Sequence, residues 1–363
     1  SIRDDFEFGS VLFYRTSAVK EAVARMDVDY QFAGLYDLRL KVSQKGALEH
    51  INEYLYYDVE LDNRTTGEKN FDYVDPKNRG VQIEMEQAAT QHLKDINGYL
   101  APGFKDVDVN CEGFEYDATV VIPCKNRVRT IGTAIKSALS QVVKAPYKFN
   151  VIVVDDNSED GSVDVIKSIV AEGHEDLTYI AQDKTWHAIG GNWNVALHHE
   201  KCGRFAIQLD SDDTYFDENT VQKFIDAFHE QNCAMVVGTY QLTDFDGNLI
   251  PPGVIDHKEW TPDNGRNNAL RIHGLGAPRG FYTPMLRTIN FPTTKYGEDY
   301  AVGLRVSREY QIGRIYDVVY NCRRWDDNSD ANCDIVTMNN NHLYKDRIRT
   351  WELKARIAMN EKK

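Results

Sequence analysis

The sequence predicts an α/β fold, in which helices cover both faces of a sheet, preceded by a smaller α/β segment. Two observations carry this prediction. From residue 118 onward, short continuous apolar runs alternate with amphipathic stretches at helical spacing, which is the pattern of parallel strands joined by helices. One apolar run, 205–209, leads directly into the carboxylates of Asp210, Asp212 and Asp213. Open α/β sheets bind ligands at the carboxyl ends of their strands, so these side chains predict a site there.

Each element follows from its own stretch of sequence, because continuous apolar runs predict strands and apolar residues at helical spacing predict helices. We expect strands at 118–122, 149–154, 177–180, 205–209 and 234–243, alternating with helices at 131–141, 163–171, 194–199 and 221–231. The dipeptide Asp246-Gly247 is typical of a hairpin turn. The stretch 251–280 is rich in Gly, Pro, Asn and Arg and predicts a long functional loop. The order is completed by an apolar run at 281–286, a helix at 300–308, a strand at 312–320 and a charged helix at 343–359.

Bulk composition narrows the class of protein. A chain of 363 residues allows two domains at ~150 residues each. The net charge of −14 argues against a nucleic-acid partner and against adsorption to anionic lipid, because no basic stripe is present to neutralise phosphates. No apolar run is long enough for a transmembrane segment. The six cysteines are scattered without a C-x-x-C pair, which suits a reducing cytoplasm.

The first hundred residues contain a partial internal repeat. Residues 36–43 can be laid on residues 300–307 at an offset of 264, and the similarity continues downstream. At this offset Gly34-Leu35 replaces Glu298-Asp299, so the N-terminal copy is expected to be non-catalytic. Chance similarity between two strand-helix segments is the alternative. We therefore expect three segments, namely an N-terminal partial copy at 1–105, a main domain at 116–335 and a helical tail at 336–363.

The carboxylates of Asp210, Asp212 and Asp213 need a counter-charge. Such a cluster stays ionised at low cost only when a cation or several donors neutralise it. A divalent metal that holds the diphosphate of a ligand is one interpretation, and a solvated acidic loop is the other. A calcium loop of the EF-hand type is excluded, because the sixth and twelfth positions from Asp210 hold Tyr215 and Val221 instead of Gly and Glu.

Five short motifs follow one another between about residue 116 and residue 330, namely Val120-Val-Ile-Pro-Cys-Lys-Asn126, Ser140-Gln141, Val153-Val-Asp-Asp-Asn-Ser158, Leu209-Asp-Ser-Asp-Asp213 and Gly297-Glu-Asp299. Together they resemble family 2 glycosyltransferases of the GT-A fold. The resemblance implies a Rossmann-like nucleotide-diphospho-sugar transferase fold with a mixed sheet flanked by helices. It also implies a metal-dependent, inverting hexosyl- or N-acetylhexosaminyltransferase of polysaccharide biosynthesis.

The same resemblance implies the substrates and the setting of the reaction. The donor would be a nucleotide-diphospho-sugar, with UDP favoured because it is frequent in the family. The acceptor would be a glycan or a lipid-linked saccharide. The protein would be cytoplasmic, with peripheral attachment to the inner membrane face through its acceptor, and a homo-oligomer is compatible with this picture.

The resemblance assigns the donor site residue by residue. Asp156 would accept a hydrogen bond from the base of the nucleotide, with Asp155 beside it and Pro123 near the base. A helix cap or an Asx turn is the alternative role for this acidic pair. Asp212 would bind Mn²⁺ or Mg²⁺, and Asp210 would reach the ribose or the donor sugar and assist at the metal. A hard cation with carboxylate and diphosphate oxygens is the expected chemistry.

Glu298 and Asp299 stand just before a predicted helix. Capping of that helix is the structural interpretation, because carboxylates are favoured at a helix N-terminus. The resemblance instead makes Asp299 the general base, which takes the proton from the acceptor hydroxyl as that oxygen attacks the anomeric carbon. Glu298 is the lesser candidate for the same role.

Two positions depart from the pattern of the family. Trp193 stands where Arg is common, while Asn194 is kept and would contact the donor sugar or cap a helix. The preceding Gly190-Gly191 lets backbone approach a ligand closely. Near the place of the usual metal-binding His the sequence has Trp325, so the metal would be held by Asp212, the diphosphate and water, or by Asp326 or another residue. Arg323 and Arg324 would then share in stabilising the phosphate charge, because Arg pairs well with phosphate.

Two other functions remain open. A sugar-1-phosphate nucleotidyltransferase also uses an α/β fold and a metal, but it normally has a Gly-rich loop after the first strand, where this chain has Pro123-Cys-Lys-Asn-Arg127. A non-catalytic protein that binds glycans or nucleotides on a degenerate transferase fold is compatible with the departures at Trp193 and Trp325.

Overall fold

The computed structural model describes residues 2–5, 8–57, 59, 75–182, 188–260, 263–325, 328 and 333–362. The chain forms two compact units. The first consists of Ser1–Pro102, Lys258–Gly274 and Asp346–Lys363, and the second of Gly103–His257 and Leu275–Lys345. The first boundary lies close to the predicted one. The sequence did not predict that part of the long loop and part of the C-terminal helix belong to the first unit.

The second unit is built on a mixed sheet with the strand order β3-β2-β1-β4-β8-β6-β9-β5, and β7 pairs with β6. The strands are β1 (Ala118–Cys124), β2 (Phe149–Asp155), β3 (Leu177–Ala181), β4 (Phe205–Gln208), β5 (Thr214–Tyr215), β6 (Met235–Thr243), β7 (Leu249–Ile255), β8 (Arg279–Tyr282) and β9 (Ile312–Arg323). Strands β3, β2, β1 and β4 are parallel, whereas β8 runs antiparallel to β4 and β6. The predicted α/β fold with a mixed sheet is confirmed.

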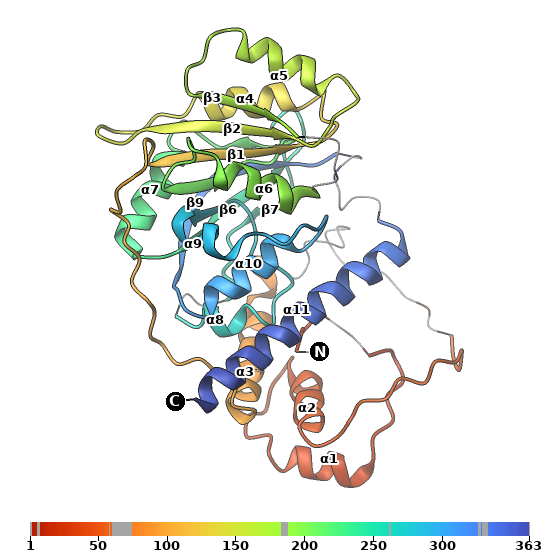
Figure 1. Cartoon of the computed structure of the whole chain (residues 1–363). Coiled ribbons are helices and arrows are strands. Elements are labelled where there is room, and N and C mark those ends of the chain that lie inside the picture. Colours follow the sequence, from red (N-terminus) through yellow and green to blue (C-terminus); the bar gives the residue numbers. More distant parts are fainter. Residues whose placement is uncertain are drawn as a thin grey trace. The chain divides into compact units, whose positions relative to one another are not determined.

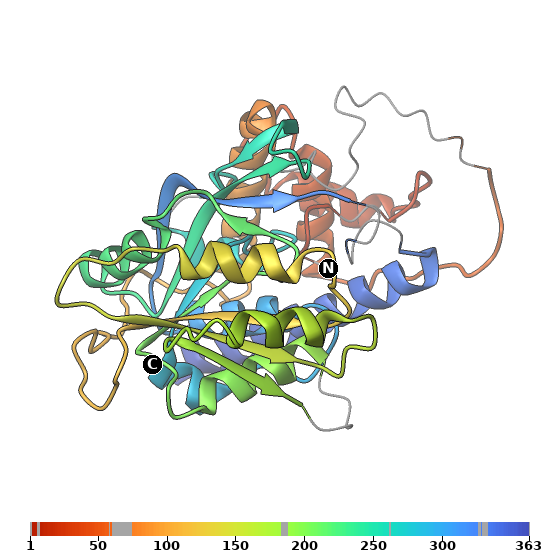
Figure 2. The ribbon, with the colours of Figure 1, turned by 90° about the horizontal axis from the view of Figure 1, so that it is seen from above.

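Helices of the second unit cover both faces of the parallel strands. Figure 1 shows α5 above the strands, α4 level with β3, and α6 below β1. Seen from above in Figure 2, yellow α4 and green α6 lie on opposite sides of the strands. The helices are α4 (Ile131–Leu139), α5 (Ser162–Val170), α6 (Ala188–His198), α7 (Thr220–Gln231), α9 (Thr283–Ile289) and α10 (Glu298–Ser307).

The register of the parallel strands brings the predicted motifs to one edge of the sheet. Strand β1 pairs with β2 up to Cys124↔Asp155, and it pairs with β4 from Ala118↔Phe205 onward. Every side chain of β1 and β4 is buried, and burial of one Val or Ile side chain contributes about 1.5–3 kcal/mol. Because these strands run in the same direction, Asp155 at the end of β2 and Asp210 just beyond β4 lie at the same carboxyl edge.

The stretch 251–280 differs from its prediction as one long loop. Strand β7 runs through Pro251-Pro252 to Ile255, a short helix α8 spans Gly265–Asn268, and β8 begins at Arg279. Proline is tolerated in β7 because this strand pairs only with β6, which leaves its other side without ladder hydrogen bonds. The hairpin predicted at Asp246-Gly247 is confirmed, since β6 and β7 are antiparallel neighbours.

The described residues of the first unit form helices and contain no strand. These helices are α1 (Thr16–Val23), α2 (Gly34–Ser43), the 3₁₀ turn η2 (Pro76–Asn78), α3 (Arg79–Asp95), α8, and the end of α11 (Ile335–Glu361). Helix α2 corresponds to α10 over its whole length at the offset of 264, but residues 48–57, the counterpart of β9, form no strand. The predicted α/β character of the N-terminal segment is therefore wrong for the described residues, and the second copy is not shown.

Helix α11 begins earlier than the charged helix that was predicted, and it is long but polar. None of the helices in the described part of the chain combines the length and the apolar character that a bilayer crossing requires.

Candidate functional site

Two neighbouring aspartates follow β2, and the structure separates their roles. Asp155 is buried, and its carboxylate accepts hydrogen bonds from the backbone N–H of Ser158 at 3.0 Å and from the hydroxyl of the same residue. This is an Asx-type turn that shapes the loop. Asp156 is 3% exposed, and no described residue donates a hydrogen bond to its carboxylate, with Lys125 Nζ 3.9 Å away. A buried carboxylate without donors suits an incoming N–H group.

The acidic residues after β4 form a crowded group. Asp213 is buried and accepts a hydrogen bond from the backbone N–H of Arg323 at 2.7 Å. Burial and the charges of Asp212 and Asp210 raise the pKa of Asp213 well above its usual range. Burial raises the pKa of Asp210 as well, the nearby charge of Asp212 adding to the effect, although hydrogen bonds from Gln208 oppose it. The surrounding protein groups therefore do not fully offset the negative charge of Asp210 and Asp213.

The carboxylate of Asp212 is held from one side by three donors. Its Oδ2 accepts a hydrogen bond from Trp325 Nε1 at 3.2 Å and from Asn328 Nδ2 at 3.3 Å, and Arg127 Nε lies 3.6 Å away. Its Oδ1 has no hydrogen-bond partner within the described residues. Trp325 therefore lies beside Asp212, the residue expected to bind the metal. An indole N–H is a donor only and cannot ligate a metal.

The donor set fits a hard divalent cation. Asp210 and Asp212 provide carboxylate oxygens, and oxygens are the ligands that Mg²⁺ and Mn²⁺ favour. Among the residues that the structure describes, no three His, Cys, Asp or Glu side chains gather closely enough to hold a metal on their own. A metal here would need further oxygens from the ligand. Asp326, the alternative ligand predicted from the sequence, lies outside the described residues.

Glu298 and Asp299 are the first two residues of α10, and their surroundings shift their carboxyl pKa values in opposite directions. Glu298 is 6% exposed, and burial together with the charge of Asp299 raises its pKa to about 8. Burial also acts to raise the pKa of Asp299, but the positive charges of Arg279 and Lys345 outweigh it and hold that pKa below its usual value. At neutral pH Glu298 is mostly protonated and Asp299 is ionised.

A bridge that the sequence did not reveal connects the acidic motif to Asp299. Gln208 Nε2 donates to both carboxylate oxygens of Asp210 at 2.9 Å, and Gln208 Oε1 accepts from Arg279 Nε at 3.1 Å. Arg279 Nη1 in turn forms an ion pair with Asp299 Oδ2. The register of β4 and β8 pairs Ile207 with Gly280, which places Gln208 and Arg279 beside each other. No signal in the local sequence indicates this pairing.

The residues of α6 have structural contacts. Trp193 is buried and stacks on Phe291 at 5.1 Å between ring centroids, so the residue that replaces the usual Arg is part of the core. Asn194 Nδ2 donates to the carbonyl of Phe291 at 2.8 Å, and its Oδ1 accepts from the N–H of the same residue at 2.8 Å. Asn194 lies inside the helix, so the predicted capping role is wrong. Its contact with a donor sugar stays a prediction.

Glycine at position 190 serves close packing inside the protein. A Cβ atom there would lie 2.0 Å from the carbonyl oxygen of Pro292. The close approach that was predicted toward a ligand is therefore an approach of α6 to the backbone before α10. The beginning of the predicted motif, Trp186-His187, lies outside the described residues.

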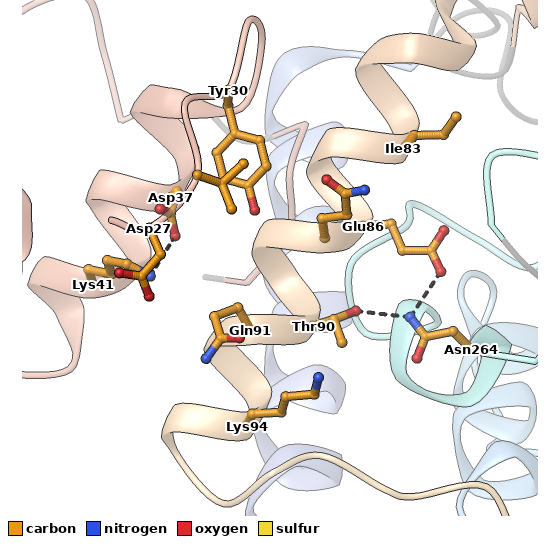
Figure 3. Close-up of a pocket in the computed structure, with 12 residues that line it drawn as sticks. Asp27, Tyr30, Asp37, Lys41, Ile83, Glu86, Thr90, Gln91, Lys94 and Asn264 are labelled. Atoms are coloured by element: carbon orange, nitrogen blue, oxygen red, sulfur yellow. Dashed lines mark hydrogen bonds and ion pairs between the residues drawn. The ribbon is translucent and has the colours of Figure 1, made fainter. Parts of the chain in front are cut away.

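A separate cavity of about 560 Å³ lies within the first unit (Figure 3). Its walls combine apolar side chains with charged side chains of both signs, and Asp37 is paired to Lys41 at 3.0 Å. Asn264 Nδ2 donates to Glu86 and to Thr90, both at 2.9 Å. None of the site residues predicted from the sequence lines this cavity, so it contributes nothing to the assignment of the motifs.

Comparisons with known proteins agree with the motif order. Residues 119–290 match the family model Glycosyl transferase family 2. Among solved structures, TarS 1-349 from S. aureus is 22% identical, with 57% of this chain and 60% of that chain covered and a TM-score of 0.46. TarS 1-349 in complex with UDP-GlcNAc is 19% identical, with 65% and 71% covered and a TM-score of 0.50. No curated protein matches the chain.

A third solved structure is the mannosyltransferase PcManGT from Pyrobaculum calidifontis in complex with GDP-Man and Mn²⁺. It is 15% identical, with 79% of this chain and 84% of that chain covered and a TM-score of 0.46. The chain spans 60% of the first TarS structure, which is less than two thirds of its length. The segment 119–290 is thus similar to glycosyltransferase family 2, and the mixed sheet that contains it has the GT-A fold.

Proposed function

We propose that the chain is a metal-dependent, inverting glycosyltransferase. It would move a hexosyl or N-acetylhexosaminyl group from a nucleotide-diphospho-sugar to a glycan or a lipid-linked saccharide. The observation that carries the proposal is the chain of contacts that links Asp299, through Arg279 and Gln208, to Asp210 in the acidic group after β4. The pKa of Glu298 is raised and that of Asp299 is lowered, which agrees with this arrangement. Environments that drive two neighbouring carboxyl pKa values apart separate a protonated group from a base.

The donor nucleotide is assigned to the loops after β1 and β2. Asp156, whose carboxylate lacks a donor within the described residues, would accept the N–H of the base, while Pro123 would lie beside the base and Asp155 would shape the turn. UDP is the favoured nucleotide. Its frequency in the family supports it, as does the UDP-GlcNAc complex of TarS 1-349, a protein of similar fold.

The diphosphate is assigned to the acidic group after β4. Asp212 and Asp210 would hold Mn²⁺ or Mg²⁺, and Arg323 and Arg324 would add positive charge. When bound, the metal supplies a Lewis acid that neutralises charge on the departing nucleoside diphosphate.

Asp299 would act as the general base in a single displacement. The acceptor oxygen attacks the anomeric carbon from the face opposite the diphosphate, the bond from that carbon to the diphosphate oxygen breaks, and the hydroxyl proton passes to Asp299. The ion pair with Arg279 orients the Asp299 carboxylate and keeps it ionised. Burial raises the pKa of Glu298, which favours Asp299 over Glu298 for this role.

The test combines binding and turnover in the full chain. Thermal stability is measured with UDP, GDP, dTDP and CMP and with their sugars, with and without Mn²⁺, for wild type and Asp212→Ala. A ligand at about 100 times its Kd adds about 2.7 kcal/mol of stability. A shift with one nucleotide that Mn²⁺ enlarges in wild type but not in Asp212→Ala supports the donor site. Donor turnover that Asp299→Asn abolishes while nucleotide binding persists supports catalysis.

Three results would contradict the proposal. A shift with no nucleotide under any condition would indicate a degenerate fold without donor binding. Equal turnover in wild type and Asp299→Asn would remove Asp299 as the base. Formation of a nucleotide-sugar from a nucleoside triphosphate and a sugar-1-phosphate would indicate a nucleotidyltransferase.

A further inference from the structure

Three guanidinium groups gather on two aromatic rings at the acidic site. Arg127 and Arg129 lie 5.8 and 5.1 Å from the ring centroid of Trp325. Arg129 and Arg323 lie 5.8 and 5.1 Å from the ring centroid of Phe245. The two rings meet edge to face at 5.5 Å. We call these five residues the arginine–aromatic cluster.

The cluster is assembled from three distant parts of the second unit. Arg127 and Arg129 lie in the loop between β1 and α4, Phe245 lies in the hairpin between β6 and β7, and Arg323 and Trp325 lie at the end of β9. Stacking on rigid rings holds planar guanidinium groups in place before a ligand arrives, which lowers the entropy cost of binding.

Two members of the cluster have unused hydrogen-bonding or charge capacity. Arg323 is 8% exposed, and its Nε donates to the carbonyl of Asp212 at 2.6 Å. Its Nη2 is buried and has no hydrogen-bond partner in the described part of the chain. Arg129 is exposed and forms no ion pair within the described residues. A buried N–H group left without a partner costs about 1–3 kcal/mol, so Arg323 Nη2 points to a ligand that supplies an acceptor.

Trp325 limits which groups can bind a metal beside Asp212, and so affects how a phosphate ligand would be bound. It stands beside Asp212 as a hydrogen-bond donor, at 3.2 Å from Oδ2, and it cannot act as a metal ligand. Among the described residues, the protein ligands for a metal at this site therefore come from the aspartate side. The positive charge that a better-ligated metal would contribute to the diphosphate can come instead from guanidinium groups, which bind phosphate oxygens in a fork geometry.

We propose that the arginine–aromatic cluster is a diphosphate-binding site that retains a nucleoside diphosphate in the absence of a divalent cation. The metal is then needed for transfer but not for binding. The inference rests on the proposed function in that the natural ligand is the diphosphate of the donor or of the product.

The experiment measures binding by calorimetry to the full chain after treatment with EDTA. The probes are inorganic pyrophosphate, UDP and UMP, each titrated without metal and then with Mn²⁺. We expect pyrophosphate and UDP to bind without metal and UMP to bind at least tenfold more weakly than UDP. The variants are Arg129→Gln, Arg323→Gln and Asp156→Asn. Arg305→Gln serves as a matched control, because Arg305 pairs with Glu309 on α10, outside the cluster.

Loss of one charged hydrogen-bond donor should weaken metal-free binding of pyrophosphate about ten- to a hundredfold. Arg129→Gln and Arg323→Gln should show this loss, and Arg305→Gln should not. Asp156→Asn should weaken UDP but leave pyrophosphate unchanged, because Asp156 is assigned to the base. Arg129 is exposed, so its variant remains informative where replacement of the buried Arg323 prevents folding.

Two results would overturn the inference. One is binding of pyrophosphate and UDP only in the presence of Mn²⁺, which would leave the proposed transferase standing and reduce the cluster to a structural stack. The other is metal-free binding that Arg129→Gln and Arg305→Gln affect equally. If pyrophosphate binds but neither UDP nor UMP binds under any condition, the anion site is supported and the proposed function is contradicted.

Discussion

Replacing Glu298 with Gln tests the distribution of charge in the carboxylate pair at the start of α10. Burial and the charge of Asp299 raise the pKa of Glu298 to about 8 from a usual value of 4.5. The folded state then binds this proton more tightly than the unfolded chain does. Its contribution to stability is complete below pH 4.5 and is lost as the pH rises through 8. Gln is neutral at every pH, so Glu298→Gln removes this dependence.

The size of the effect follows from the pKa difference. One pKa unit corresponds to about 1.4 kcal/mol, so the wild-type free energy of unfolding should fall by about 4 kcal/mol relative to the variant between pH 4.5 and pH 8. Other titrating groups affect both proteins alike and cancel in the difference. Turnover of Glu298→Gln at neutral pH should stay within about tenfold of wild type, because the variant mimics the protonated side chain.

The assay is equilibrium unfolding in urea for wild type and Glu298→Gln at several pH values from about 5 to 9. The informative quantity is the difference between the two unfolding free energies at each pH. A difference that stays constant over this range would mean that Glu298 is ionised in the folded protein. The reason for choosing Asp299 over Glu298 as the base would then be lost.

Three further predictions concern the same region. Asp299→Asn should lower turnover by about 10²–10⁴-fold while the Kd of the nucleotide stays unchanged, as measured by steady-state kinetics and calorimetry. Arg279→Ala should lower turnover without weakening nucleotide binding, and free guanidinium should restore part of it, whereas a purely structural role would show no rescue. Gly190→Ala should destabilise the protein by about 1–3 kcal/mol, because its Cβ would meet Pro292 at 2.0 Å, and Gly274→Ala, with nothing within 4 Å, should leave the melting temperature nearly unchanged.

The parts of the fold that local patterns define were predictable from the sequence. Strands such as β1 and β2 are continuous apolar runs with polar residues at their ends, so both the strands and the position of Asp155 follow from the sequence. The N-terminal segment was not predictable in the same way. Residues 48–57 resemble β9, but a strand also needs a neighbour to pair with, and the described residues of the first unit offer none.

The candidate site also combines residues that a local sequence pattern identifies with residues that it does not. Asp212 could be identified because it belongs to a compact motif, whereas Gln208 and Arg279 come together only through antiparallel pairing of β4 with β8. Asn194 looked free to bind a sugar, but its amide is engaged by Phe291, 97 residues away in sequence. Contacts of this range depend on the whole sheet, and no local pattern in one sequence reports them.

Gln208 and Arg279 connect the carboxylate assigned to the donor with the carboxylate assigned to the acceptor. Asp210 follows β4 and would serve the donor, while Asp299 begins α10 and would serve the acceptor. Catalysis requires such groups to be held within about 0.5 Å of their working positions, which loops alone rarely achieve. Gln208 ends β4 and Arg279 begins β8, so two paired strands of the sheet hold both carboxylates. A substitution at Gln208 should therefore change donor affinity and turnover together, whereas one at Arg279 should change turnover alone.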